Sequence, residues 1–242
     1  MSKPTITLIT INYNNANGLK KTIESVKSLI CRDFEYIVVD GASTDGSLDV
    51  IKANSGIITK YISEKDNGIY DAINKGIKLA EGSLIGLVHS GDTILPDALS
   101  GLKELHEAHP DSVLYGALKT SKNGVFDSVW GWNADLLPRQ MIPHLAAFVP
   151  KQVYDEYGDY DLNYKIAADY ECFLRFYKRG VNFIFIDKII CDFDLGGISQ
   201  RTSDAETEKE VIAIKQKYSV YKEPTKMESM KKAVKRFLKH IR

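Results

Sequence analysis

The stretch Ser83-Leu-Ile-Gly-Leu-Val-His-Ser-Gly-Asp92 decides the fold class. Residues 84–88 are apolar without alternation, which predicts a strand buried on both faces. The strand runs into a short polar turn that closes with the carboxylate of Asp92. Because open α/β sheets bind ligands beyond the carboxyl ends of their strands, this turn predicts a ligand crevice. Asp92 is well placed there to hold a divalent metal, which would suit a diphosphate group.

Strand and helix patterns alternate around this stretch. The residues expected in strands are 6–11, 35–40, 58–63 and 83–89. The residues with a helical pattern are 19–30, 45–51, 69–80 and 98–109. This repetition predicts an α/β fold with a mostly parallel central sheet and helices on both faces.

The second half of the chain is less regular. Its patterns predict a strand at 113–115, a hairpin over 119–132, a helix over 167–178, and strands over 183–186 and 189–193. We find no convincing linker before about residue 200. We therefore expect one fused domain over residues 1–200, with a C-terminal helical extension over 201–242.

Composition and charge narrow the function classes. The 242 residues carry 32 basic and 32 acidic side chains, but residues 226–242 hold seven basic side chains against one acidic. The remaining chain therefore has an acidic excess of six, which argues against nucleic-acid binding by the main body. The three cysteines form no C-x-x-C pair, which argues against a disulfide framework or structural zinc and favours a reducing compartment. With no apparent signal peptide and no apolar run near the ~20 residues that span a bilayer, we expect a cytoplasmic protein.

The basic C-terminal segment has its own pattern. Its lysines and arginines face away from a helical stripe of apolar side chains, which consists of Met227, Met230, Val234, Phe237, Leu238 and Ile241. This composition is typical of an interfacial membrane helix, so residues 226–242 predict peripheral contact with the inner face of the cell membrane. Packing of the stripe on the domain or on a second subunit is the alternative, which leaves a homo-oligomer open.

Polar side chains crowd the ends of the first two strands. The first strand ends in Thr10-Ile-Asn-Tyr-Asn-Asn15, where Tyr13 can stack on a base or cover the sheet edge. The second ends in Asp40-Gly-Ala-Ser-Thr-Asp-Gly46. We favour a ligand contact for Asp40, whereas Asp45 is interpreted as a helix cap.

A third polar cluster lies within residues 63–76. Asp66-Asn-Gly68 predicts a turn, and the helix that follows places Asn74 and Lys75 among several hydrogen-bonding groups. Lys75 can approach a phosphate group; a solvated helix face is the alternative.

Four of these strings, taken in order, resemble the family 2 glycosyltransferases, which are inverting enzymes with a GT-A fold. The strings are Thr10-Ile-Asn-Tyr-Asn14, Val39-Asp-Gly-Ala-Ser-Thr-Asp-Gly46, Gly68-Ile-Tyr-Asp-Ala-Ile-Asn-Lys-Gly76 and the strand with its turn at 83–92. The resemblance covers about residues 4–200 and is densest over 6–95. Four such elements in order are far more specific than any one alone.

The resemblance implies a nucleotide-sugar-binding half over residues 1–110 and an acceptor half with the catalytic base over 111–200. Within the first half, Tyr13 would flank the base and Asp40 would hydrogen-bond the base ring. The residues implied to contact the nucleotide are Thr10, Asn12, Tyr13, Asp40, Asn74 and Lys75. Those implied to contact the sugar or diphosphate are Asp66, Ser90, Gly91, Gly196, Gly197 and Arg201. The two glycines stand in Asp194-Leu-Gly-Gly-Ile-Ser-Gln-Arg201, where hinge glycines are the alternative.

Asp92 would be the metal ligand of the family's D-x-D motif, for Mn²⁺ or Mg²⁺. The match is imperfect, because many members have Asp-Asp where this chain has Gly91-Asp92. One carboxylate is therefore missing, and diphosphate oxygens with water would complete the coordination shell. His89 is a weaker ligand candidate, with packing or orientation of a neighbour as its preferred interpretation.

Ala167-Ala-Asp-Tyr-Glu-Cys-Phe-Leu-Arg175 resembles the family's x-D-x-x-x-x-L-R element, whose aspartate deprotonates the acceptor hydroxyl. That role falls on Asp169, with Glu171 as the second candidate on the acceptor side. By itself the pattern favours a helix cap or a partner of the helix dipole, whereas together with the other motifs it favours the base. Ile142-Pro-His-Leu-Ala-Ala-Phe148 resembles a segment bordering the acceptor, so His144 is either an acceptor contact or a structural histidine.

The sequence therefore predicts an inverting glycosyltransferase that moves a hexosyl or N-acetylhexosaminyl group in surface-polysaccharide biosynthesis. Its donor would be a nucleotide-diphosphate sugar, by default a UDP-sugar, and its acceptor a glycan or lipid-linked hydroxyl. The alternative is a catalytically weakened nucleotide- or glycan-binding partner subunit. Dehydrogenases and P-loop enzymes are excluded because G-x-G-x-x-G and G-x-x-x-x-G-K-[ST] are both absent.

Overall fold

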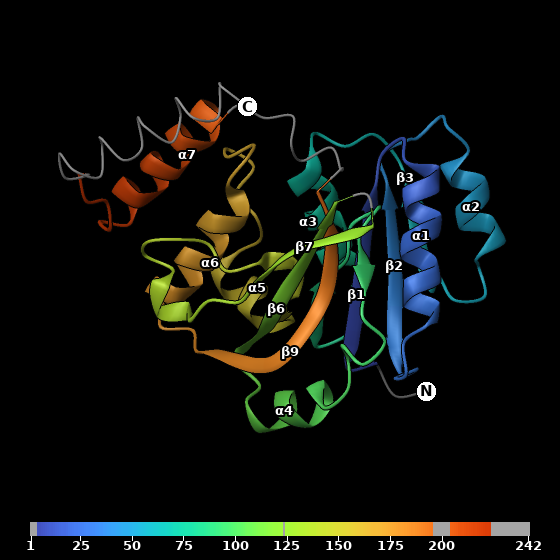
Figure 1. Ribbon diagram of the computed structural model, residues 1–242, viewed down its shortest axis with the longest axis horizontal. Coiled ribbons are helices and arrows are strands. Elements are labelled where there is room, and N and C mark those ends of the chain that lie inside the picture. The colour runs from blue at the N-terminus through green and yellow to red at the C-terminus, as the bar shows by residue number, and fades with distance from the viewer. Residues whose placement is uncertain (1–3, 123, 196–203, 224–242) are drawn as a thin grey trace.

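The computed structural model describes residues 4–122, 124–195 and 204–223 (Figure 1). Strands and helices alternate along the first half, as the sequence predicts. Its elements are β1 (Ile6–Asn12), α1 (Ala16–Lys27), β2 (Phe34–Asp40), α2 (Ser47–Ala53), β3 (Lys60–Ser63), α3 (Ile69–Leu79), β4 (Leu84–Leu87), β5 (Thr93–Ile94) and α4 (Leu102–Ala108).

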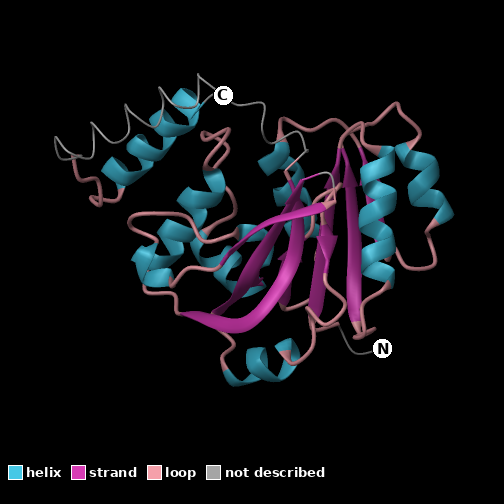
Figure 2. Cartoon of the chain, viewed as in Figure 1, coloured by secondary structure: helices cyan, strands magenta, loops and turns pink. Residues whose placement is uncertain are grey.

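The second half adds further strands and helices. They are β6 (Val113–Lys122), β7 (Val125–Trp130), η1 (Ala134–Leu136), η2 (His144–Ala146), β8 (Ala147–Pro150), α5 (Lys151–Tyr157), α6 (Ala168–Lys178), β9 (Phe183–Asp194) and α7 (Asp204–Lys217). Figure 2 shows helices on both sides of the strands, so the expected α/β architecture is confirmed.

The strands pair in the order β3-β2-β1-β4-β8-β6-β9-β5, and β7 pairs with β6. β1 to β4 are mutually parallel wherever they pair. β8 runs antiparallel between β4 and β6, while β9 is parallel to β6. The carboxyl ends of β1, β2 and β4 therefore meet at one edge of the sheet, which we call the site edge.

The structure changes several predicted boundaries. β6 is ten residues long because it pairs along its length with β7 and β9, and β9 is one strand rather than two. α4 begins at Leu102, after turns that end in Gly101 with φ +78°. α1 ends at Lys27, so Ile30 lies outside it with its side chain 69% exposed. The predicted hairpin is confirmed by the β6–β7 pairing.

The core is one continuous apolar cluster that joins the two halves. β1 is buried at every position, and its buried residues include the polar Thr7, Thr10 and Asn12. In the neighbouring β4, Gly86 faces the ring of Phe148 on β8, and a Cβ at Gly86 would lie only 2.5 Å from Phe148 Cε1. This glycine therefore lets the aromatic ring pack directly on the central strand.

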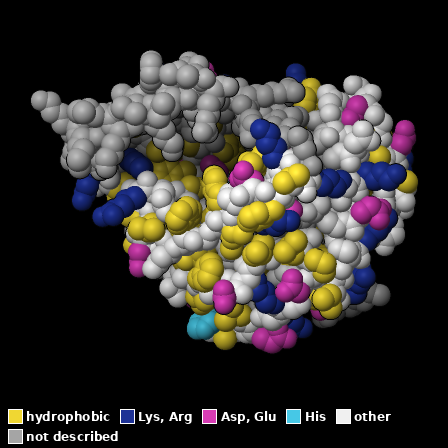
Figure 3. Space-filling model, viewed as in Figure 1, with side chains coloured by type: hydrophobic (Ala, Val, Ile, Leu, Met, Phe, Trp, Pro, Cys, Tyr) yellow, Lys and Arg dark blue, Asp and Glu magenta, His cyan; other side chains and the backbone are white. Residues whose placement is uncertain are grey.

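Hydrophobic side chains remain exposed over β7 and β9, where Figure 3 shows them gathered on the face turned to the viewer. They include Val125, Phe126, Val129, Trp130 and Phe185. None of the helices in the described ranges is long and apolar enough to cross a membrane. The predicted membrane-binding segment, residues 226–242, lies outside the described residues.

Candidate active site

Asp40 lies at the end of β2, directly opposite Asn12 at the end of β1. Its carboxylate is fully buried and accepts hydrogen bonds from Asn12 Nδ2 (2.8 Å), Ser43 Oγ (2.6 Å), Ser43 N (3.0 Å) and Ser63 Oγ (2.7 Å). Burial disfavours the charged form, but these hydrogen bonds outweigh it and lower the pKa of Asp40. Asp40 is therefore an ionised carboxylate that organises the ends of three strands and loops.

The amide oxygen of Asn12 is a second feature of this end of the sheet. Its Nδ2 donates to Asp40, but its Oδ1 is buried and has no hydrogen-bond partner among the described residues. Leaving a buried acceptor unpaired costs roughly 1–3 kcal/mol, so such an atom is suited to receive an N–H group from a ligand. Asn12, rather than the fully bonded Asp40, therefore holds the unpaired acceptor.

Tyr13, Gly41 and Asp66 lie together beside this acceptor. A Cβ at Gly41 would stand 2.9 Å from Asp66 Oδ2 and 3.1 Å from Tyr13 Cδ2. The Tyr13 ring is 62% exposed and thus open for stacking. Gly41 therefore allows Tyr13 and Asp66 to pack closely on the backbone, and a larger residue would push them aside.

Lys75 is less open than the sequence suggests. Its ammonium group donates to Asp66 Oδ1 (2.7 Å) and to the carbonyl of Lys65 (2.9 Å), and it pairs with Glu64 (2.9 Å). Burial works against the charged form, but the bonds to Asp66 and Glu64 outweigh it and raise the pKa of Lys75. A phosphate at this position would have to compete with these carboxylates.

Two predicted nucleotide contacts are not brought to the site. Thr10 is buried and donates to the carbonyl of Val88 (2.8 Å), while its oxygen also bonds the Tyr36 hydroxyl. Asn74 is buried and bonds both the N–H and the C=O of Tyr160 (3.0 and 2.9 Å). Their polar groups therefore form hydrogen bonds inside the protein. Those of Thr10 join β1 to its neighbouring strands, and those of Asn74 join α3 to the second half of the chain.

The turn after β4 is held by Thr22 of α1. Thr22 Oγ1 donates to the carbonyl of Asp92 (2.7 Å) and accepts from Gly91 N (3.0 Å), which has φ +109°. The carbonyl of Ser90 in turn accepts a hydrogen bond from Asn15 Nδ2 (3.1 Å). The turn is thus fixed to the start of α1, and its positive φ explains why a glycine occupies position 91.

The Asp92 side chain is 5% exposed, and its Oδ1 accepts from the N–H of Asp194 (3.0 Å). Burial raises the pKa of Asp92 to about 7, which means that its charge lacks full compensation in the ligand-free protein. The described residues contain no group of three or more His, Cys, Asp or Glu side chains that could hold a metal. They fit a metal ion only if diphosphate oxygens and water supply most of its ligands, as Mg²⁺ sites commonly allow.

Asp169 lies in the first turn of α6. Its Oδ2 lies 3.0 Å from Nδ1 of His144, while its Oδ1 accepts from Tyr170 N (2.8 Å) and contacts the Tyr70 hydroxyl (3.1 Å). Burial opposes ionisation, but the His144 contact and these hydrogen bonds outweigh it and lower the pKa of Asp169. Asp169 is therefore an ionised carboxylate with a fixed orientation.

His144 connects this carboxylate to the turn after β4. Its Nε2 lies 3.4 Å from Nε2 of His89, and the carbonyl of His89 accepts from Asp92 N (3.0 Å). Burial lowers the pKa of His89 to about 3, so that ring is neutral. A chain of contacts thus links the Asp169 carboxylate, through His144 and His89, to the backbone of Asp92. Asp169 is therefore connected to the turn that carries Asp92.

Glu171 faces away from this site. It is 1% exposed and binds Arg175 (3.2 Å) and Lys217 (2.9 Å). Residues two apart on a helix lie on different faces, so Glu171 cannot share the environment of Asp169. The expectation that it contacts the acceptor has no support in this geometry.

Several site residues were not found by sequence reasoning. Each of them binds a predicted functional group or its turn: Ser43, Ser63, Thr22 and Tyr70. Ser43, Ser63 and Tyr70 stand within the polar clusters found in the sequence, whereas Thr22 stands outside them and carried no signal. Gly196, Gly197 and Arg201 lie outside the described residues. For His144, the contact with Asp169 favours a role beside the base.

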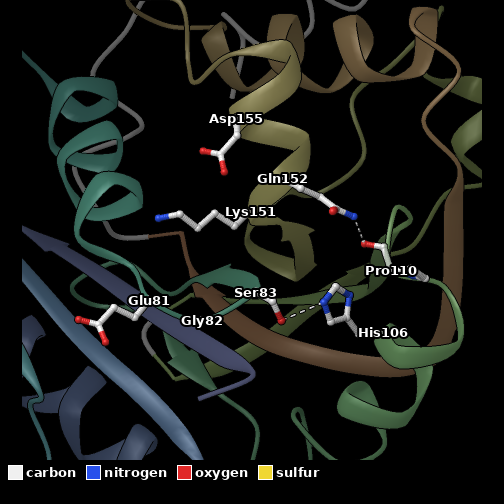
Figure 4. A pocket seen from close by; sticks show the side chains of 8 residues that line it. All are labelled: Glu81, Gly82, Ser83, His106, Pro110, Lys151, Gln152 and Asp155. Atoms are coloured by element: carbon white, nitrogen blue, oxygen red, sulfur yellow. Dashed lines mark hydrogen bonds between the residues drawn. The ribbon is translucent and has the colours of Figure 1, made fainter. Parts of the chain in front are cut away.

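A pocket of about 340 Å³ lies at the opposite edge of the sheet (Figure 4). It is lined by Glu81, Gly82, Ser83, His106, Pro110, Lys151, Gln152 and Asp155. Ser83 immediately precedes β4, so this pocket adjoins the amino end of that strand, and Lys151 donates to the carbonyls that end α3. It is thus separate from the carboxylates of the site edge.

Comparison with known proteins gives a consistent result. The family model described as Glycosyl transferase family 2 matches residues 7–182. An uncharacterized glycosyltransferase of Mycobacterium tuberculosis strain ATCC 25618 / H37Rv is 33% identical over 220 residues, which cover 81% of this chain and 78% of that protein. A PGL/p-HBAD biosynthesis glycosyltransferase of Mycobacterium bovis strain BCG / Pasteur 1173P2 is 29% identical over 217 residues, which cover 85% of this chain and 83% of that protein.

Solved structures share the fold. S. aureus TarS 1-349 in complex with UDP-GlcNAc superimposes with a TM-score of 0.72 at 17% identity, covering 87% of this chain and 65% of that one. The mannosyltransferase PcManGT from Pyrobaculum calidifontis, in complex with GDP-Man and Mn²⁺, superimposes with a TM-score of 0.60 at 19% identity, covering 80% and 57%. The chain thus spans less than two thirds of either structure, and the likeness establishes the GT-A fold.

Proposed function

Because this chain belongs to glycosyl transferase family 2, we propose that it transfers a sugar from a UDP-sugar to a hydroxyl of a glycan or lipid-linked acceptor. One observation carries the proposal: the contact chain from Asp169 through His144 and His89 to Asp92. It supports a site in which a candidate base and a candidate diphosphate-side carboxylate share one edge of the sheet. The two carboxylates have opposite pKa shifts, as different chemical tasks require.

The donor nucleotide would bind at the ends of β1 and β2. The uracil ring would stack on the exposed ring of Tyr13, and its N3–H would donate to the unpaired Oδ1 of Asn12. Asp40 would act one step back, by fixing the Asn12 amide through its Nδ2. Uridine is chosen because two structural neighbours hold UDP-GlcNAc or UDP.

The diphosphate would lie beside Asp92. A Mn²⁺ or Mg²⁺ ion held by Asp92 and the diphosphate oxygens would neutralise charge on the leaving group. In this chain Thr22 and Asn15 hold the turn that carries Asp92, so the carboxylate is fixed before the donor arrives. Gly91 supplies the close backbone approach that a bulky side chain would block.

The acceptor oxygen would attack the anomeric carbon while the bond from that carbon to the diphosphate breaks, and its electron pair leaves with UDP. The acceptor proton would pass to Asp169, which is ionised and ready to receive it. His144 would hold Asp169 Oδ2 toward the site through its Nδ1–H. A single displacement of this kind inverts the anomeric carbon.

We place this reaction in polysaccharide biosynthesis, supported by the relative named for PGL/p-HBAD biosynthesis. We propose that the enzyme works in the cytoplasm, at the inner face of the membrane. The basic, amphipathic residues 226–242 support that location.

A screen of nucleotides tests the donor assignment. Thermal unfolding would be followed with UDP, GDP, CDP and dTDP, each with Mn²⁺ or Mg²⁺, and then with sugars on the winning base. We expect UDP to raise the melting temperature most, and a UDP-sugar to be consumed once a suitable acceptor is present. Stabilisation by another nucleotide alone would reject the uridine assignment, and binding without turnover would favour a binding subunit.

Asn12→Ala is expected to weaken UDP binding about tenfold, the effect of one buried hydrogen bond of about 1.4 kcal/mol. Titration calorimetry measures this directly. N3-methyl-UDP lacks the N–H group, so it should bind the wild type as weakly as UDP binds the variant. Its own affinity should be the same for the wild type and for Asn12→Ala. Asn17→Ala, an exposed site on α1, is the matched control. Equal affinity of the wild type for UDP and its N3-methyl analogue would remove Asn12 from this role.

A further inference from the structure

The last described helix reaches back to the loop that leads to Asp169. The carboxylate of Glu210 on α7 accepts three hydrogen bonds from consecutive backbone N–H groups, those of Lys165 (3.0 Å), Ile166 (2.9 Å) and Ala167 (2.9 Å). Ala167 is the N-cap position of α6 and has no side chain that could serve as a cap. One side chain from the C-terminal extension therefore organises the start of the helix that carries Asp169.

The Ile166–Ala167 peptide group transmits this contact. Its N–H donates to Glu210, while its C=O accepts from the Tyr70 hydroxyl at 2.7 Å. Because a peptide group is planar and stiff, a shift of one end moves the other. Glu210 and Tyr70 are thus coupled through one rigid peptide group.

Tyr70 carries the coupling to the base. Its one hydroxyl hydrogen lies between two acceptors, the carbonyl of Ile166 (2.7 Å) and Oδ1 of Asp169 (3.1 Å). If the carbonyl of Ile166 turned away, that hydrogen would bond to Asp169 alone. A carboxylate that accepts a stronger hydrogen bond is a weaker base, and its orientation changes with it.

A second set of contacts docks α7 independently. Lys217 and the Tyr218 hydroxyl bond Glu171 at 2.9 and 2.5 Å, and Lys215 donates to the carbonyl of Arg139 (2.7 Å). Figure 1 shows α7 beyond α6, on the side away from β1 and β2. Docking of the helix therefore does not depend on Glu210 alone, so the two roles can be separated by mutation.

We propose that Glu210 is a positioning residue for the reaction: it fixes the Ile166–Ala167 peptide and, through Tyr70, sets the orientation and strength of Asp169 as a base. The inference rests on the role proposed for Asp169. It assigns part of the catalytic arrangement to the C-terminal extension, which the sequence separates from the domain at residue 200.

A double-mutant cycle tests the coupling. Glu210→Gln is expected to lower kcat about tenfold with the KM for the UDP-sugar unchanged within twofold, since the base weakens and the donor site is untouched. In a Tyr70→Phe background, which has no hydroxyl to redistribute, the same change should cost less than twofold. Lys209→Gln, exposed on the same helix, should match the wild type, and Lys217→Gln should lower the melting temperature without a comparable loss of kcat.

Equal losses of kcat in the wild-type and Tyr70→Phe backgrounds, or no loss in either, would overturn the proposal. A crystal structure of Glu210→Gln gives a readout that needs no turnover: the Tyr70 hydroxyl should no longer bond the carbonyl of Ile166. An unchanged Tyr70–Ile166 contact would also overturn it. If the wild type transfers no sugar at all, the proposed function fails, whereas the crystal structure still decides the coupling.

Discussion

Asp169→Asn is expected to lower the rate of sugar transfer by about 10³-fold, within the range that positioned bases contribute. The amide keeps the size of the side chain but cannot accept the acceptor proton. UDP affinity, measured by calorimetry, should stay within twofold because the nucleotide would bind at the ends of β1 and β2. The loss should therefore fall on kcat and leave donor binding intact.

Asp155→Asn makes the same chemical change on an exposed residue of α5, beside the opposite pocket, and should keep wild-type turnover. Turnover of Asp169→Asn within tenfold of the wild type would remove Asp169 from the role of base. The anomeric configuration of the first product, followed by proton NMR, tests the geometry independently. Retention of the donor configuration would exclude a single displacement.

Asp92→Asn is expected to stabilise the metal-free protein and to abolish metal-linked donor binding. Burial raises the pKa of Asp92 from 3.8 to about 7, so the folded state holds its proton more tightly than the unfolded state. The ionised carboxylate therefore costs stability above pH 7, and this cost vanishes below about pH 4. Asp92→Asn should raise the melting temperature by on the order of 5 °C at pH 8 and by little at pH 4.

The same carboxylate should make donor binding depend on pH and metal. In the wild type, Mn²⁺ should raise the melting temperature of the UDP-bound protein further than UDP alone does. This Mn²⁺ increment should fall as pH drops through 7, because protons compete with the metal ion for Asp92. Asp92→Asn should show no Mn²⁺ increment at any pH. Asp97→Asn, an exposed change nearby, is the control. A full Mn²⁺ increment in Asp92→Asn would show that the ion is held elsewhere.

The local patterns of the chain predicted the centre of the sheet well because β1, β2 and β4 are buried almost throughout. Each of these strands is rich in apolar and β-branched residues, and each leads into the polar residues at the site edge. The pairing of Asp40 with Asn12 follows from that parallel register. Long-range contacts were less readable: β6 continues well past its apolar start because β7 and β9 pair with it.

The direction in which a polar side chain points was the main limit of sequence reasoning at the site. Thr10 and Asn74 stand within the expected strings, yet their polar groups bond the interior. Glu171 stands two residues from Asp169, yet the helix turns it toward α7. Motif spacing places a residue on an element, whereas its partner across the fold decides which way its polar group turns.

The dependence of Asp169 on Glu210 has a consequence for how the polypeptide matures. Every strand in the described part of the chain precedes Glu210 in the order of synthesis, so a nascent chain can fold its nucleotide-binding half long before α7 leaves the ribosome. Such a chain would bind UDP before Asp169, the proposed catalytic base, is held in its active orientation. Ribosome-stalled chains that end between β9 and α7 should therefore bind UDP but transfer no sugar. During normal synthesis, sugar transfer should begin only after α7 has emerged.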